Sequence, residues 1–153
     1  MKKYAIDSCS LINAAKYYSL RKSTFESIWE KLANMIDSGE LISTVEVKEE
    51  LKDDELLEWI KVNNCMFLPL SEKIQKKATD ILKEYPTLIK MKSSGNSNAD
   101  PFLIATAIIE NATIISDERK GDETSRDYHI PNVCEHYNIE CITLQTFLDI
   151  IIE

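Results

Sequence analysis

Short apolar segments alternate along this chain with longer segments that have the amphipathic pattern of helices. The short segments have the length and composition of buried strands. Strands that alternate with helices predict an α/β protein with a mostly parallel sheet, because a parallel connection has to cross a face of the sheet and is usually helical. We expect strands at residues 3–6, 41–45, 65–70, 113–116 and 141–143.

Several of the expected helices carry capping signals. The spacing of Ser23 and Glu26 is typical of a capping box, and Gly39 ends the helix that this box would open. Ser71 is expected to cap a helix that runs to about Tyr85. Further helices are expected at residues 11–18, 46–51 and 54–62, after His129 and up to residue 152, with polar loops at 90–98 and 119–129.

One helix is expected to be central to the fold. It begins at Asn98-Ala99-Asp100-Pro101, where Asn or Asp can cap a helix and Pro fits the first turn. Residues 102–109 are then apolar on nearly every side, so the helix should be buried.

Length and charge limit the classes of protein. A chain of 153 residues has the usual size of one domain, so we expect a single domain over residues 1–153. The net charge of −8 is unusual for a protein that binds nucleic acid through a basic surface. Either the protein avoids nucleic acid, or its acids are concentrated where metal ions neutralise them. The longest apolar run is far shorter than the ~20 residues of a membrane span, so we expect a cytoplasmic protein without a membrane segment.

Four cysteines are too few for a disulfide framework and are expected as free, mostly buried thiols. A zinc site is an alternative, because His129, Cys134, His136 and Cys141 lie within thirteen residues. The segment has no CxxC, however, and Cys141 opens an expected strand. Ordinary core packing is therefore favoured over zinc.

Acidic residues follow the expected strands or open the expected helices. Asp7 follows the first strand, Asp117 and Glu118 follow a later one, and the carboxyl ends of parallel strands share one edge of the sheet. Asp100 opens the central helix, and Glu46, Glu49 and Glu50 crowd a short one. Each acid alone is more often a helix cap or part of a solvated face.

Taken together, these acids predict a metal site. Two carboxylates ~5 Å apart repel by about 3 kcal/mol at an effective dielectric constant near 20, so a cluster needs protons or cations. Sites built only from oxygen ligands favour Mg²⁺ or Mn²⁺, either of which can activate water for attack on a phosphodiester.

Four segments resemble the motifs of PIN-domain nucleases, in the same order and along nearly the whole chain. They are Ile6-Asp7-Ser8-Cys9-Ser10-Leu11-Ile12, Val47-Lys48-Glu49-Glu50-Leu51, Ala99-Asp100-Pro101-Phe102-Leu103-Ile104-Ala105 and Ile114-Ile115-Ser116-Asp117-Glu118. The chain is more similar still to a PIN-like family of unassigned function, whose members share residues 53–59 and the segment Ile130-Pro131-Asn132-Val133-Cys134.

The resemblance implies a three-layer α/β/α fold and a metal-dependent endoribonuclease. Asp7, Glu50 and Asp100 would be the principal metal ligands. Glu118 would be the fourth acid, with Asp117 beside it as a second catalytic candidate. The family usually has Asp where this chain has Glu118, and this departure leaves open whether the site binds one metal ion or two. Ser8 and Ser116 would support the site by hydrogen bonding, unless they are only caps at strand ends.

PIN nucleases of this size often act as the toxin of a toxin–antitoxin pair and often dimerise. The resemblance therefore implies RNA as substrate, an antitoxin as a protein partner and a homodimer. RNA-binding candidates are the basic residues near the same rim, with Tyr17 and Tyr18 as stacking faces. These basic residues are Arg119, Lys120, Arg21 and Lys22, together with Lys16, Lys90 and Lys92.

Three other classes of protein are alternatives. A catalytically inactive PIN-like interaction module would keep the fold, although all four motif positions still carry a carboxylate. A receiver-like signalling domain would need an acidic pair directly before its phosphorylated strand and a Lys after a later strand, and neither is found at the required place around residues 41–70. A phosphatase with a strand-end nucleophile needs Asp-x-Asp, where this chain has Asp7-Ser8-Cys9.

Overall fold

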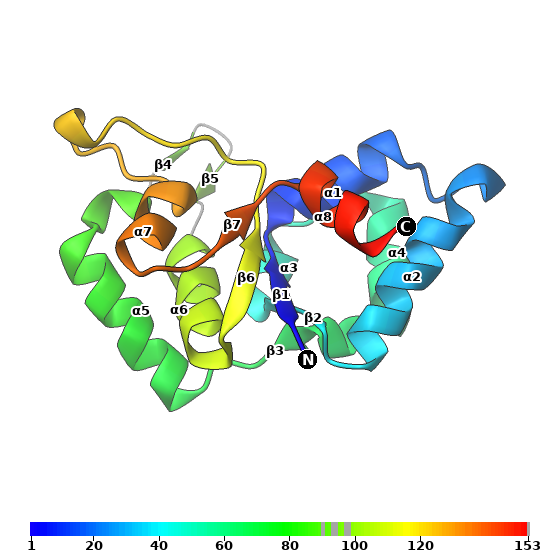
Figure 1. Cartoon of the computed structure of the whole chain (residues 1–153), viewed down its shortest axis with the longest axis horizontal. Coiled ribbons are helices and arrows are strands. Elements are labelled where there is room, and N and C mark those ends of the chain that lie inside the picture. Colours follow the sequence, from blue (N-terminus) through cyan, green and yellow to red (C-terminus); the bar gives the residue numbers. More distant parts are fainter. Residues whose placement is uncertain (90, 93–94, 97–98, 153) are drawn as a thin grey trace.

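Five parallel strands form the central sheet, in the order β3-β2-β1-β6-β7 (Figure 1). They are β1 (Lys3–Ile6), β2 (Leu41–Thr44), β3 (Phe67–Leu68), β6 (Ala112–Ile115) and β7 (Cys141–Ile142). This computed structural model describes residues 1–89, 91–92, 95–96 and 99–152. β2 and β6, on either side of β1, are buried along their whole length, as is usual for strands covered on both faces.

Helices cover both faces of the sheet, so the predicted three-layer α/β/α fold is confirmed. Figure 1 shows α5, α6 and α7 on the left of the sheet and α1, α2, α4 and α8 on its right. The helices are α1 (Ser8–Tyr17), α2 (Glu26–Asp37), α3 (Val45–Glu49), α4 (Asp54–Val62), α5 (Glu72–Glu84), α6 (Asp100–Glu110), α7 (Ile130–His136) and α8 (Leu144–Ile151). Within the described part of the chain, no helix has both the length and the apolar character needed to cross a membrane.

The buried core is centred on α6, as predicted from its composition. Its residues Leu103, Ile104 and Ala105 have no exposed surface. The helix packs against α5 on one side and against β1, β2 and β6 on the other. Its first residue, Asp100, is thereby held beside the sheet.

The strand order reverses at β1, which pairs with β2 on one side and with β6 on the other. In open α/β sheets the ligand site lies beyond the carboxyl ends of the strands at such a point. A receiver-like domain would place its third strand beside β1, whereas β3 here pairs with β2. The receiver-like alternative is therefore wrong for this fold.

Local signals predicted some helix ends correctly and others wrongly. The Ser71 hydroxyl caps α5 by accepting a hydrogen bond from the Ile74 amide. The capping box at Ser23 is wrong, because Ser23–Phe25 form a turn of 3-10 helix and α2 begins only at Glu26. Helix α1 begins three residues earlier than predicted, because the Asp7 side chain caps it.

Two predicted segments also differ in length or form. The third strand is shorter than predicted, because Asn64–Met66 form a 3-10 turn before β3. In the predicted loop 90–98, Met91–Lys92 (β4) and Gly95–Asn96 (β5) form an antiparallel pair. Lys90, the side chain of Lys92 and the proposed cap Asn98 lie outside the described residues.

Candidate active site

Asp7 occupies the position where β1 ends and α1 begins. Its backbone is extended, and its Oδ1 accepts a hydrogen bond of 2.9 Å from the Ser10 amide in the first turn of α1. The residue is only 5% exposed. The sequence motif therefore places a buried carboxylate at the carboxyl end of the central strand.

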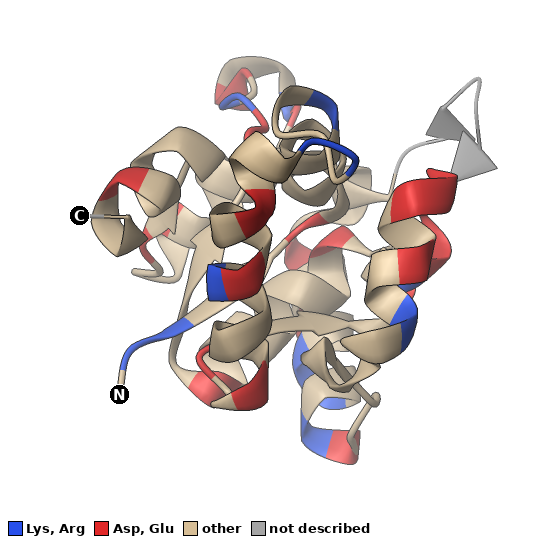
Figure 2. Cartoon of the chain, turned by 90° about the vertical axis from the view of Figure 1, so that its right-hand side faces the viewer, with Lys and Arg blue, Asp and Glu red and all other residues tan. Residues whose placement is uncertain are grey.

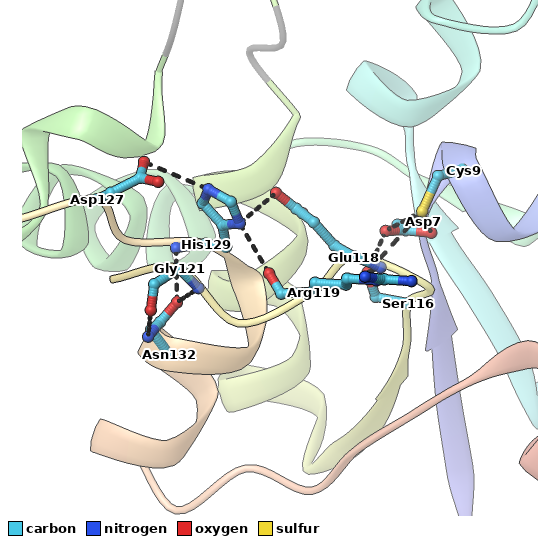
Figure 3. Close-up of polar contacts among 9 residues, drawn as sticks. All are labelled: Asp7, Cys9, Ser116, Glu118, Arg119, Gly121, Asp127, His129 and Asn132. Atoms are coloured by element: carbon cyan, nitrogen blue, oxygen red, sulfur yellow. Dashed lines mark hydrogen bonds and ion pairs between the residues drawn. The ribbon is translucent and has the colours of Figure 1, made fainter. Parts of the chain in front are cut away.

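Neutral groups surround this carboxylate (Figure 3). The Ser116 hydroxyl, just beyond β6, donates to Asp7 Oδ2 at 2.6 Å, and the Cys9 thiol lies 3.0 and 3.1 Å from the two oxygens. Burial raises the pKa of Asp7, and these hydrogen bonds oppose the increase. Within the described residues, no Lys, Arg or His forms an ion pair with Asp7.

Cys9 acts here as a hydrogen-bond donor and not as a thiolate. Burial, followed by the charge of Asp7, raises the pKa of the Cys9 thiol far above its ordinary value. The thiol therefore stays protonated and can donate to Asp7. This contact was not predicted, and Cys9 was expected only as a free thiol.

Glu50 is linked to Ser8, the residue after Asp7. It follows α3 as the C-cap residue, and its Oε1 accepts a hydrogen bond of 3.1 Å from the Ser8 hydroxyl. Ser8 directly follows Asp7, so this bond links the second acidic motif to the first. Ser8 and Ser116 thus each hold one of the predicted ligand carboxylates.

Asp117 and Glu118 have different surroundings. Each carboxylate oxygen of Asp117 accepts a hydrogen bond, one from the Asn13 amide group at 2.7 Å and one from the Leu144 backbone N–H at 2.8 Å. The Glu118 backbone N–H donates to Ser116 Oγ at 3.1 Å, but its side chain extends toward His129, with Oε1 3.9 Å from Nδ1 (Figure 3).

The predicted ligand carboxylates do not form a closed ligand set. Glu50 is bound by Ser8, the neighbour of Asp7, whereas Glu118 extends toward His129 and Asp100 is half-buried at the start of α6. Among the described residues, no three His, Cys, Asp or Glu side chains lie close enough together to hold one ion. Repulsion between carboxylates favours this separation as long as no cation lies between them.

The residues of the zinc alternative also have other surroundings. His136 Nε2 lies 2.8 Å from Glu123, and His129 Nδ1 lies 2.7 Å from the carbonyl oxygen of Arg119. Cys134 is buried in the core, and Cys141 is half-buried in β7.

A buried asparagine, Asn132, organises the loop after Glu118. No role for this residue was predicted from the sequence. Asn132 has no exposed surface; its side-chain oxygen accepts hydrogen bonds from the Gly121 and His129 amides, and its nitrogen donates to the Gly121 carbonyl oxygen. The loop is tightly packed at Gly121, where a Cβ atom would lie 1.8 Å from the Asp127 carbonyl oxygen. The only signal was the segment Ile130–Cys134 shared with the PIN-like family of unassigned function.

The predicted RNA-binding residues differ in whether they are already paired. Arg21 forms an ion pair with Glu55, and Lys120 forms one with Glu135. Arg119 is exposed and its side chain has no such partner among the described residues. Lys22 is exposed ahead of the 3-10 turn. Figure 2 shows acidic and basic residues interspersed over the helices on one side of the molecule.

Comparison with solved structures shows the same fold in a remote relative. The crystal structure of VapBC2 from Rickettsia felis, bound to a promoter DNA fragment, contains a chain that is 16% identical to this one. The match covers 92% of this chain and 97% of that chain, with a TM-score of 0.51. At this identity the likeness shows the fold alone, and it supports the PIN-like architecture.

Comparison with curated proteins found no match. The family described as "Domain of unknown function (DUF4411)" matches residues 4–150, which is nearly the whole chain. The chain therefore belongs to the DUF4411 family.

Proposed function

We propose that this chain is a metal-dependent endoribonuclease of the PIN type, and that it acts as the toxin of a toxin–antitoxin pair. The observation that carries the proposal is the carboxylate of Asp7, which is buried at the point where the strand order reverses and has, among the described residues, only neutral hydrogen-bond donors. The Ser8 hydroxyl, on the next residue, binds Glu50. The likeness in fold to a chain of the VapBC2 complex supports the same assignment and an antitoxin as partner.

The donor set fits Mg²⁺ or Mn²⁺. Asp7, Glu50 and Asp100 would hold the ion, because hard divalent cations prefer carboxylate oxygens, and Glu118 would join them by turning its side chain away from His129. Asp7 is a buried carboxylate that has no cationic partner among the described residues, and a cation would stabilise its charged form. When bound, the ion would supply an activated water and charge stabilisation at the phosphodiester.

The protein's own residues would orient these ligands. The Ser116 hydroxyl fixes Oδ2 of Asp7, and the Ser8 hydroxyl fixes Oε1 of Glu50. Ligands held by such outer hydrogen bonds lose little freedom on binding, which favours a defined geometry. Single-stranded RNA as the substrate and a homodimer as the active assembly belong to the same proposal.

The deciding experiment compares RNA cleavage by the wild type and by Asp100→Asn. A panel of RNAs is incubated with Mn²⁺, with Mg²⁺ or with a chelator. The wild type should cleave only with metal, and Asp100→Asn should be slower by at least about 100-fold, because it loses a ligand. Asp80→Asn, which changes an exposed acid on α5, is the matched control and should cleave like the wild type. Equal cleavage by the wild type and Asp100→Asn would exclude the assignment.

A second candidate is an inactive PIN-like interaction module. The absence of a three-ligand cluster among the described residues favours it. Thermal unfolding with and without Mn²⁺ separates the two candidates. At about 100 times its Kd, the ion should stabilise the nuclease by about 2.7 kcal/mol, and the inactive module not at all.

A further inference from the structure

The loop that begins at Glu118 presents one arginine beside the candidate active site. The Arg119 side chain is exposed and has no ion pair or side-chain hydrogen bond among the described residues. Its neighbour Lys120 is paired with Glu135, and Arg21 is paired with Glu55. Of these three cations, Arg119 is therefore the one available to a ligand.

The backbone of Arg119 is fixed on both sides. Just before it, the Glu118 amide donates to Ser116 Oγ at 3.1 Å. Its own carbonyl oxygen lies 2.7 Å from His129 Nδ1, and because a carbonyl oxygen can only accept, this nitrogen donates. The loop therefore presents Arg119 from a defined backbone position.

Asn132 holds His129 in place. It accepts a hydrogen bond of 2.9 Å from the His129 amide and one of 2.7 Å from the Gly121 amide, and it donates to the Gly121 carbonyl oxygen at 3.1 Å. Because Asn132 has no exposed surface, these bonds are shielded from water. The chain of contacts thus runs from Asn132 through His129 to Arg119.

The Arg119 side chain points toward the candidate active site. In Figure 3 the side chain extends from the loop toward Ser116 and Asp7, whereas its carbonyl oxygen faces His129. A guanidinium group can bind two phosphate oxygens at once. When its backbone is already ordered, less entropy is lost on binding.

We propose that Arg119 binds a backbone phosphate of the substrate strand next to Asp7, and that Asn132 is the positioning residue that holds Arg119 there through His129. The proposal deepens the proposed function and takes single-stranded RNA from it as the ligand. It concerns binding, so it is tested without cleavage.

The test measures binding of a fluorescent single-stranded RNA by anisotropy, in the presence of EDTA and over a range of NaCl concentrations. Arg119→Ala should raise the Kd about tenfold at low salt, because it removes a charged hydrogen-bond donor. It should also reduce the slope of log K against log salt by about 0.7, the value for one phosphate contact on a single strand. Arg126→Ala, in the same loop and with the same change of charge, should leave the slope unchanged.

The role of Asn132 is tested in two backgrounds. Asn132→Ala should weaken binding and reduce the slope in the wild type, but add little when Arg119 is already alanine. His129→Ala and His129→Gln provide a second route if Asn132→Ala does not fold. Gln can still donate to the Arg119 carbonyl, so it should retain most of the affinity that Ala loses.

Three results would overturn the proposal: no RNA binding by the wild type, an unchanged slope in Arg119→Ala, or an equal effect of Asn132→Ala with and without Arg119. Its failure is distinguishable from that of the proposed function. If the wild type binds RNA with the expected slope but never cleaves it, the nuclease assignment fails and the phosphate contact of Arg119 stands. If the wild type cleaves RNA but Arg119→Ala leaves the slope unchanged, the phosphate contact fails and the nuclease assignment stands.

Discussion

Asp7 has two roles, because one carboxylate both caps a helix and forms the centre of the candidate active site. Its Oδ1 holds the first turn of α1 through the Ser10 amide, and its Oδ2 accepts the Ser116 hydroxyl. Capping favours the charged form, whereas burial disfavours it and raises the pKa above the ordinary value of 3.8. The folded state therefore holds this proton more tightly than the unfolded state does.

This shift fixes the sign of a pH dependence. A raised pKa in the folded state gives stability that is fully present below about pH 3.8 and is lost as the pH rises through the folded pKa. Without metal, Asp7→Asn should therefore be more stable than the wild type at pH 7, with a Tm higher by about 2–4 °C for a gain near 1 kcal/mol. The gain should shrink as the pH approaches 4, as measured by calorimetry.

Asp80→Asn is the control for a carboxylate that is exposed on α5. It should show no comparable gain in Tm at pH 7. A lower Tm for Asp7→Asn at every pH would mean that the charged cap stabilises the fold by more than burial destabilises it.

At the scale of elements, Asp117 joins three segments that are distant in the sequence. It follows β6, its Oδ2 accepts from Asn13 in α1, and its Oδ1 accepts from the Leu144 backbone N–H at the start of α8. Thr143 also caps α8, by accepting from the Thr146 amide. The acid that the PIN resemblance gave as a second catalytic candidate thus has a structural role.

We expect Asp117→Ala to lower the free energy of unfolding by about 1–2 kcal/mol, because two partly buried donors lose their acceptor. Asn13→Ala should cost less, since the bond to Leu144 remains. The double variant should be less destabilised than the sum of the two, because both changes remove the same bond. Urea unfolding of the four proteins measures this coupling, and strict additivity would contradict the bond between Asn13 and Asp117.

At the scale of the whole molecule, α6 lies between α5 and the sheet and is central to the buried core. It packs against α5 and against three strands, and its central residues are fully buried. Aromatic groups report on the two outer layers separately. Trp29 and Trp59 are in contact between α2 and α4, and the Tyr85 and Tyr128 rings are in contact beside α5.

A single core predicts a single unfolding transition. Tryptophan fluorescence, which reports on the α2 and α4 layer, and far-UV circular dichroism, which reports on all helices, should give the same urea midpoint. Near-UV circular dichroism adds the tyrosines beside α5. Separate midpoints would contradict the expectation of one domain over residues 1–153.

The alternation of strand and helix was enough to predict the parallel sheet and the central helix α6. It also predicted that Asp7 and the residues after β6 would share one edge of the sheet, because the carboxyl ends of parallel strands lie together, and Ser116 in that segment donates to Asp7. The cap at Ser71 was predictable because its bond spans three residues. The capping-box pattern at Ser23 failed, since a 3-10 turn uses the same residues.

The order of the elements, the central helix and the place of Asp7 at the carboxyl end of β1 follow from the sequence pattern. These features depend on periodicity and on bonds between near neighbours. The folded chain adds that Asp117 supports α1 and α8, that Glu118 turns toward His129, and that Arg119 rather than Lys120 is left unpaired among the described residues. Those outcomes depend on competition between side chains far apart in the sequence, for which a pattern of residue types carries no signal.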